Sequence, residues 1–101
     1  FMYVVTKITT KSPAVSHKVE RVQTGIRIEK RLLKVLKGLA ELKDLSLGDL
    51  LEGIILHAFE SKAPFSATTI KQLGELKKIY GLTLTASDSH RLEEARPKKP
   101  G

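Results

Sequence analysis

The chain of 101 residues is 41% hydrophobic and 29% charged, which is the composition of a single globular domain and excludes a fibre or a fully disordered chain. Because it has no cysteine, it has no disulfide framework, no thiolate nucleophile and no thiol metal site. Its 18 basic side chains against 11 acidic ones leave a net charge of +7, which favours polyanion partners such as nucleic acid, although such a charge can also serve solubility alone.

The first predicted element covers residues 3–10, where β-branched and aromatic side chains favour a short strand or an extended arm. A Ser-Pro pair at residues 12–13 interrupts this pattern. We therefore predict an N-terminal arm or short strand over residues 1–17. Three roles stay open for this arm: pairing with a later strand, exchanging between subunits, or reaching along a bound nucleic acid.

The clearest strand pattern follows at residues 18–28, where apolar and polar side chains alternate. A period of two places alternate residues on opposite faces of a strand. One face is polar and basic and carries Arg21, Gln23, Gly25 and Arg27. The other face is suited to burial and carries Val22, Thr24, Ile26 and Ile28.

Helical patterns follow the predicted strand. Apolar residues at three- and four-residue intervals predict helices over about 29–43, 47–59 and 66–80. Ser46 and Ser66 are the expected N-caps, Asp49 resembles the acid of a capping box, and Gly81 is the expected stop. The chain therefore divides into residues 18–62, which hold the predicted strand and the first two helices, and residues 63–101, a helical extension with a basic tail.

A lone strand beside amphipathic helices leaves its backbone N–H and C=O groups without partners. The interrupted connection through residues 11–17 disfavours a tight hairpin with residues 3–10. The same strand of a second copy is the other source of hydrogen bonds, paired antiparallel about a two-fold axis. The expected dimer core consists of Val22, Thr24, Ile26, Ile28, Leu36, Leu50, Leu51, Ile54 and Ile55.

Two stretches carry a resemblance to a known family: QTGIRIEKRLL at residues 23–33 and DLSLGDLL at residues 44–51. Over roughly residues 20–60 the chain resembles the ribbon-helix-helix DNA-binding family, to which the Arc and MetJ repressors belong. The resemblance implies a fold that is mainly α with one short β-strand per chain. It implies an intertwined homodimer with an intersubunit antiparallel β-ribbon, extended here by a C-terminal helix.

In that family the ribbon lies in the major groove and its outward side chains contact base edges. The resemblance therefore implies Gln23, Gly25 and Arg27 as base-reading positions. Arg27 can donate to both O6 and N7 of guanine, and Gln23 can pair with adenine. Gly25 departs from the pattern because it has no side chain to read with.

The resemblance also implies phosphate contacts at the start of the second helix, through backbone N–H groups at its positive end. The matching positions are Ser46, Leu47 and Gly48. Lys18 and Arg21 are expected to contact phosphate or solvent rather than base edges.

We therefore expect a cytoplasmic, nucleoid-associated prokaryotic repressor that binds double-stranded DNA with sequence preference as a homodimer, with a dimer of dimers on DNA left open. Two other functions stay open. One is an antitoxin whose residues 66–96 bind a toxin protein. The other is a basic helical protein-interaction module that binds no DNA.

No enzymatic site is expected. His17, His57 and His90 lack the spacing and acidic companions of a metal site, and the acidic residues lack the paired placement of acid-base catalysis. No Gly-rich phosphate loop or Ser nucleophile motif occurs. We expect no catalytic residue, metal, cofactor or membrane partner, since the apolar runs are too short to span a bilayer and the N-terminus lacks the pattern of a secretory signal.

Overall fold

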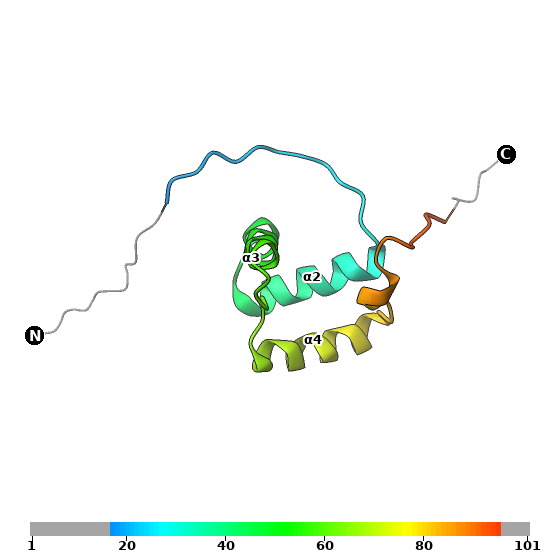
Figure 1. Cartoon of the computed structure of the whole chain (residues 1–101). Helices are drawn as coiled ribbons and strands as arrows, with labels where there is room; N and C mark the ends of the chain where they lie inside the picture. The colour runs from blue at the N-terminus through cyan, green and yellow to red at the C-terminus, as the bar shows by residue number, and fades with distance from the viewer. Residues whose placement is uncertain (1–16, 96–101) are drawn as a thin grey trace, which may run out of the picture.

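The computed structural model describes residues 17–95, and over this range the chain forms three α-helices and one turn of 3-10 helix (Figure 1). The helices are α2 (Lys30–Lys43), α3 (Leu47–Phe59) and α4 (Ala67–Tyr80), and the 3-10 turn is η1 (Ala86–Asp88). The prediction of a mainly α chain with a C-terminal helix is confirmed. The arm or strand predicted at residues 3–10 lies outside the described residues.

The ends of α3 and α4 confirm the predicted capping residues. The hydroxyl oxygen of Ser46 accepts a hydrogen bond from the backbone N–H of Asp49 at 3.1 Å. Ser66 does the same for the N–H of Thr69 at 3.2 Å. Each bond satisfies one of the N–H groups that a helix start leaves without an intrahelical partner. Gly81 ends α4 with a φ of 67°, in the left-handed region that glycine adopts without steric cost.

The start of α2 uses a less common cap. The carboxylate of Glu29 accepts a hydrogen bond from the N–H of Leu32 at 2.8 Å and is also paired with the side chain of Arg31. The backbone bond, followed by the nearby guanidinium, holds the pKa of the Glu29 carboxyl below its usual value. The charged form of Glu29 is therefore the form that stabilises the first turn of α2.

The hydrophobic core lies along α2, which packs against both other helices. Figure 1 shows α3 nearly end-on, while α2 and α4 lie across the view and run in opposite directions. The antiparallel arrangement is fixed at one end by Arg31, whose Nη1 donates to the backbone oxygen of Gly81 at 3.1 Å. The buried apolar side chains are Val35, Leu39, Ala40, Leu50, Leu76 and Leu82. The core thus joins α4 to the helices before it, across the expected domain boundary at residues 62–63.

Gly38 allows α2 and α4 to approach closely. A Cβ atom at this position would lie 3.0 Å from Cδ2 of Leu76 and 3.7 Å from Cε2 of Tyr80. A side chain here would press on the end of the Leu76 side chain, which would have to shift within the core. The sequence pattern does not single out Gly38, because the neighbour that requires it belongs to a helix almost forty residues later.

The predicted strand and β-ribbon are wrong for the described part of the chain: residues 17–95 contain no β-strand. Residues 17–29, which we call the extended segment, run without regular secondary structure before α2 and arch over α3 (Figure 1). Alternating side chains favour an extended backbone, but a strand also needs a neighbouring strand for its hydrogen bonds. Because the described chain contains no other strand, it offers no such neighbour.

Candidate nucleic-acid interface

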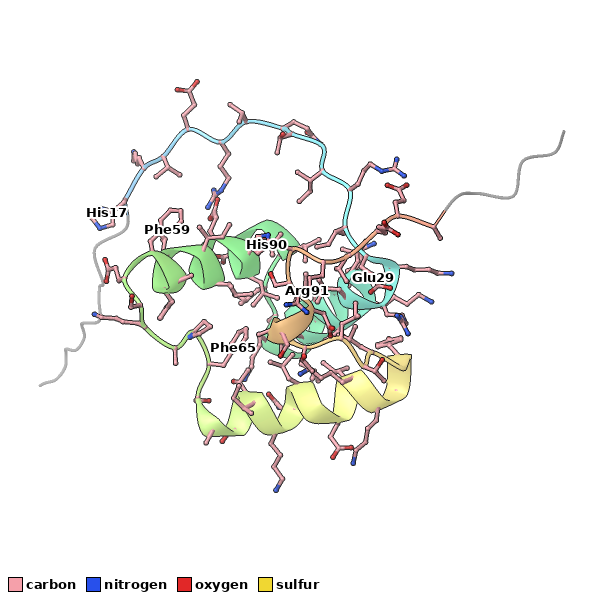
Figure 2. The ribbon with its side chains drawn as sticks, turned by 45° about the vertical axis from the view of Figure 1, so that its right-hand side comes forward. His17, Glu29, Phe59, Phe65, His90 and Arg91 are labelled. Carbon is pink, nitrogen blue, oxygen red and sulfur yellow. The ribbon has the colours of Figure 1, made fainter. Side chains whose placement is uncertain are left out.

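The extended segment contains the longest run of exposed residues in the described chain. Residues 17–27 are exposed, and residues 17–28 make no backbone–backbone hydrogen bond with the other described residues. Figure 2 shows the segment running from His17 to Glu29 with many of its side chains directed away from the helices. Backbone polar groups and side chains of this segment are therefore both open to a partner.

The three predicted base-reading positions, Gln23, Gly25 and Arg27, all lie on this segment and are exposed. A Cβ at Gly25 would meet no atom within 4 Å, so packing does not require glycine there. Arg27 is paired with the carboxylate of Glu94, in the stretch after η1. No sequence pattern indicates this pair, because the two residues are sixty-seven positions apart.

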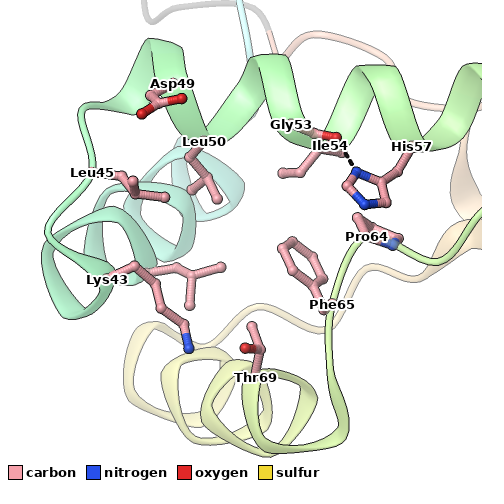
Figure 3. A pocket seen from close by; sticks show the side chains of 11 residues that line it. Lys43, Leu45, Asp49, Leu50, Gly53, Ile54, His57, Pro64, Phe65 and Thr69 are labelled. Carbon is pink, nitrogen blue, oxygen red and sulfur yellow. Dashed lines mark hydrogen bonds between the residues drawn. The ribbon is translucent and has the colours of Figure 1, made fainter. Parts of the chain in front are cut away.

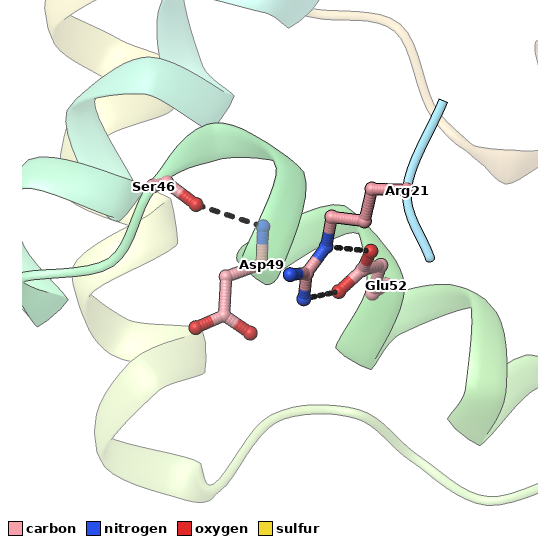
Figure 4. Close-up of polar contacts among 4 residues, drawn as sticks. All are labelled: Arg21, Ser46, Asp49 and Glu52. Atoms are coloured by element: carbon pink, nitrogen blue, oxygen red, sulfur yellow. Dashed lines mark hydrogen bonds and ion pairs between the residues drawn. The ribbon is translucent and has the colours of Figure 1, made fainter. Parts of the chain in front are cut away.

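Two residues of the segment, Lys18 and Arg21, are predicted to contact phosphate, and their surroundings in the structure differ. Lys18 is exposed, and it makes no ion pair with a described residue. Arg21 instead forms a two-pronged pair with Glu52 of α3 (Figure 4). The hydrogen bond and opposite charge raise the pKa of Arg21 and lower the pKa of Glu52. The pair anchors the middle of the extended segment to α3.

The start of α3 holds the remaining predicted phosphate contacts. Ser46 and Gly48 are exposed and Leu47 is half-buried. The Ser46 hydroxyl is already used as the cap of the helix (Figure 4). Within the described residues, the Asp49 carboxylate makes no return bond to the Ser46 N–H, so the predicted capping box is wrong at its second half. Asp49 is exposed and places negative charge beside this helix end.

The predicted dimer-core residues divide into two sets in the single chain. Leu50 is buried, and Leu36 and Ile54 pack against the core. The segment residues are mostly solvent-facing: Val22 is 81% exposed and Ile26 is 72% exposed. The other four predicted dimer-core residues are exposed or half-buried, namely Thr24, Ile28, Leu51 and Ile55.

A groove separates the extended segment from the helices beneath it. This segment groove has a volume of about 680 Å³ and is lined by residues of the segment and, on α2 and α3, by Leu33, Leu36, Leu47, Gly48 and Leu51. Beyond it, the second half of α3 exposes Ile55, Leu56 and Phe59. Apolar side chains exposed together in this way are typical of surfaces that associate with a partner.

The described part of the chain is much less basic than the whole sequence. Residues 17–95 carry 13 basic and 11 acidic side chains, so most of the basic excess belongs to residues 1–16 and 96–101. Among the described cations, Arg21, Arg27 and Arg31 are each paired with a glutamate. Lys34 lies over the ring of Tyr80, with Nζ 6.0 Å from its centroid. This contact joins α2 to α4 on the surface of the protein.

The histidines are not gathered into a metal site. The residues between 17 and 95 include no group of three or more potential metal-ligating side chains. His57 Nδ1 lies 2.7 Å from the backbone oxygen of Gly53, one helical turn earlier. In the same range, no helix is long and apolar enough to cross a membrane.

Comparison of the chain with protein-family models, curated proteins and solved structures finds no match. No comparison identifies the ribbon-helix-helix family, and residues 17–95 lack the β-strand that the fold implied by the resemblance requires.

Proposed function

We propose that this protein binds double-stranded DNA as a homodimer and represses transcription by occupying a promoter. In this proposal the extended segment of each copy lies in the major groove, with Gln23 and Arg27 on base edges. Lys18 and Arg21 contact phosphates. The observation that carries the proposal is the exposure of residues 17–27, with no backbone–backbone hydrogen bonds to the rest of the described chain.

The dimensions and chemistry of the segment fit a DNA groove. The major groove is about 12 Å wide and admits a whole α-helix, so a single extended segment also fits. Gly25 lets the backbone approach closely, because it adds no side chain between Gln23 and Arg27. On binding, Arg27 exchanges the carboxylate of Glu94 for the acceptor edge of a base. Both are charge-assisted hydrogen bonds, and the pair given up is solvent-exposed, so the exchange costs little.

The charge of the whole chain supports attraction to a polyanion. Residues 1–16 contribute two lysines and residues 96–101 contribute three basic side chains, with no acid in either stretch. These charges flank a described part that is nearly neutral. Contacts between basic side chains and phosphate release counterions, which makes affinity strongly dependent on salt.

The apolar surface around the segment groove supports a second copy as the partner. Val22, Ile26, Ile55 and Phe59 are all large, apolar and exposed in the single chain. Removing such surface from water stabilises an interface by roughly 25 cal/mol for each Å² buried. A second copy also presents two extended segments at a fixed spacing, as a two-fold symmetric DNA site requires.

The position of α4 favours this function over the antitoxin alternative. Leu76 of α4 is part of the core, and Arg31 of α2 donates to Gly81 at the end of α4. A segment held in this way is committed to the domain, whereas a toxin-binding tail needs to be free to engage its partner. Residues 67–80 should accordingly resist limited proteolysis in the protein alone.

The direct test is fluorescence anisotropy with a labelled duplex selected by the protein from a random pool, compared with a scrambled duplex across a salt series. We expect the logarithm of affinity to fall linearly with the logarithm of salt concentration. Arg27→Ala should weaken the selected duplex by about tenfold or more and change the scrambled duplex little. Lys18→Ala should weaken both alike.

Two control variants test whether the losses of affinity in Arg27→Ala and Lys18→Ala come only from the removal of one positive charge. Arg91→Ala and Lys71→Ala each remove one exposed cation outside the extended segment, and both should bind nearly as the unaltered protein does. Equal losses from Arg27→Ala and Arg91→Ala would contradict base contact by Arg27. No duplex binding at low salt would reject the DNA-binding proposal and favour a protein partner.

Light scattering after gel filtration tests the homodimer. Ile55→Lys and Ile70→Lys change two similarly exposed side chains, 46% and 55% accessible, on α3 and α4. The first should give a folded monomer and the second should remain a dimer. Ile54→Lys is a poorer test, because Ile54 packs against the core of the single chain and its loss would disturb folding as well.

A further inference from the structure

A second cavity lies against a different face of α3 from the segment groove. This three-helix pocket has a volume of about 440 Å³ and opens among the end of α2, the face of α3 and the start of α4 (Figure 3). Most of its lining is apolar and includes Leu39, Leu50, Ile54 and Phe65, of which Leu39 and Leu50 are buried. The volume falls within the range of about 300–1,000 Å³ that small-molecule pockets occupy. The space therefore suits an apolar compound of modest size.

A cation borders the pocket where α2 ends. Lys43 belongs to the last turn of α2, is half-buried and lines the pocket. It makes no ion pair with a described residue, and no other lysine or arginine is among the lining residues. Electrostatic attraction strengthens as water is excluded. A half-buried ammonium group beside an apolar space therefore attracts an anion more strongly than an exposed one does.

A buried hydroxyl group lines the pocket at the start of α4. Thr69, in the first turn of α4, is 6% exposed and is the only buried polar side chain among the described residues. Its oxygen accepts a hydrogen bond from the Ser66 hydroxyl at 3.2 Å, which leaves the Thr69 proton for a further acceptor. Figure 3 shows Lys43 extending toward the start of α4, where Thr69 lies. This end of the pocket thus holds two hydrogen-bond donors.

The other ionisable lining residues lie away from Lys43. Asp49 is on the opposite side of the pocket, with leucine side chains between the two (Figure 3). Its carboxylate is turned toward Arg21, whose positive charge attracts it (Figure 4). His57 borders the far end, with its Nδ1 2.7 Å from the Gly53 backbone oxygen. A ligand whose head group is held at Lys43 therefore has its body among apolar side chains.

We propose that the three-helix pocket binds an apolar monocarboxylate, such as a medium-chain fatty acid. Its carboxylate pairs with Lys43 and accepts a hydrogen bond from the Thr69 hydroxyl. Its hydrocarbon chain packs against Leu50, Ile54 and Phe65. An amine would face a like charge at Lys43, and a dicarboxylate would place its second charge among apolar side chains. This inference does not depend on DNA binding, because the pocket and the segment groove share no lining residue.

Isothermal titration calorimetry of the full chain tests the proposal with octanoate as the probe. Butyrate shortens the chain, octanol removes the charge and octylamine reverses it. Burying one methylene group strengthens binding by up to about fourfold, so octanoate should bind at least about tenfold more tightly than butyrate. Loss of the charge-assisted hydrogen bond should make octanol and octylamine weaker by at least about tenfold as well. Equal binding of octanoate, octanol and octylamine, or no binding of octanoate at about 1 mM, would overturn the proposal.

Variants locate the head group of the ligand. Lys43→Gln should weaken octanoate by about tenfold and Thr69→Val by about threefold, since each removes one donor to the carboxylate. Lys43→Arg keeps the charge and should retain most of the affinity. Lys71→Gln removes an exposed cation of α4 outside the pocket and should leave binding unchanged. A loss of affinity in His57→Gln without one in Lys43→Gln would place the carboxylate at the other end of the pocket and overturn the assignment.

A further variant locates the hydrocarbon chain. Gly53→Leu adds a side chain at the lining, where a Cβ meets no atom within 4 Å. It should narrow the pocket and weaken octanoate without lowering the midpoint of urea unfolding, because leucine is favoured over glycine in a helix. Circular dichroism and urea unfolding establish that each variant is folded. Unaltered octanoate binding in Lys43→Gln, Thr69→Val and Gly53→Leu together would place the ligand elsewhere and contradict the proposal.

Discussion

Arg21 and Glu52 join the extended segment to α3 through two parallel hydrogen bonds, from Nε to Oε2 and from Nη2 to Oε1, each 2.8 Å long (Figure 4). The planar guanidinium and the carboxylate match in this geometry, which makes the pair more specific than a contact between two point charges. The two residues are 31 positions apart in the sequence. In this pair the Arg21 guanidinium binds Glu52, whereas in the proposed DNA complex it contacts phosphate.

Glu52→Gln should raise the affinity of the protein for duplex DNA, because it frees the Arg21 guanidinium for phosphate. Glu60→Gln is the matched control: Glu60 also pairs with a cation and its loss changes the net charge equally, but its partner, Lys62, lies outside the extended segment. Anisotropy with one duplex compares the two variants. A gain no larger for Glu52→Gln than for Glu60→Gln would mean that Arg21 takes no part in binding.

Acid should weaken the fold in part through Glu29 and Glu52. The pKa of each carboxyl is lowered in the folded chain. The main cause is the hydrogen bond from the Leu32 N–H for Glu29 and the hydrogen bond from the Arg21 side chain for Glu52. Such groups stabilise the folded state above the ordinary glutamate pKa of about 4.3, and this contribution is lost as pH falls through the lower folded pKa. Urea unfolding of the unaltered chain and of Glu29→Gln/Glu52→Gln should show a difference in free energy of unfolding at pH 7 that shrinks toward pH 3. A difference independent of pH would contradict this origin.

Gly38→Leu should destabilise the domain by about 1–3 kcal/mol, since the added side chain meets Leu76 at a distance that leaves no room for it. Gly74→Ala provides the contrast. A Cβ at Gly74 meets no atom within 4 Å, and alanine is favoured over glycine in a helix by about 0.8–1 kcal/mol. Thermal or urea unfolding should therefore move in opposite directions for the two variants. Stabilisation by both would show that α2 and α4 are farther apart than the structure has them.

Leu39→Ala should cost about 2–5 kcal/mol of unfolding free energy, the range for removing a buried leucine side chain and leaving a cavity. Leu39 is fully buried, whereas Leu42, one turn later on α2, is 54% exposed. Leu42→Ala should consequently cost much less. The midpoints of urea unfolding give the comparison, and similar losses in both variants would place the core on the wrong face of α2.

Gly25→Ala should separate folding from DNA binding. Because a Cβ at Gly25 has no neighbour within 4 Å and its φ is not positive, the fold should tolerate alanine. If the backbone lies close to the bases, the added methyl group should weaken the selected duplex. Circular dichroism and anisotropy on the same sample measure the two effects, with Gly74→Ala as the variant expected to change neither DNA affinity nor helix positions. If Gly25→Ala kept full affinity for the selected duplex, this would contradict a close approach of the backbone to the bases at this position.

Much of the helical structure could be predicted because its determinants are local. Apolar spacing, the hydroxyls of Ser46 and Ser66, and the glycine at position 81 act within one or two turns of the chain. The strand prediction failed for the opposite reason. Alternation at residues 18–28 is also local and favours an extended backbone, but a sheet requires a second strand, and the described chain supplies none.

The sequence by itself determined which segments are helical, where α3 and α4 begin and where α4 ends, but its alternating pattern at residues 18–28 wrongly predicted a strand. Only the tertiary structure decided which distant groups meet. It brought Glu52 to Arg21, Glu94 to Arg27 and Leu76 to Gly38. The physical reason is that hydrogen bonds, ion pairs and van der Waals contacts act over a few ångströms in space, and one sequence without its fold does not state which residues lie within that distance.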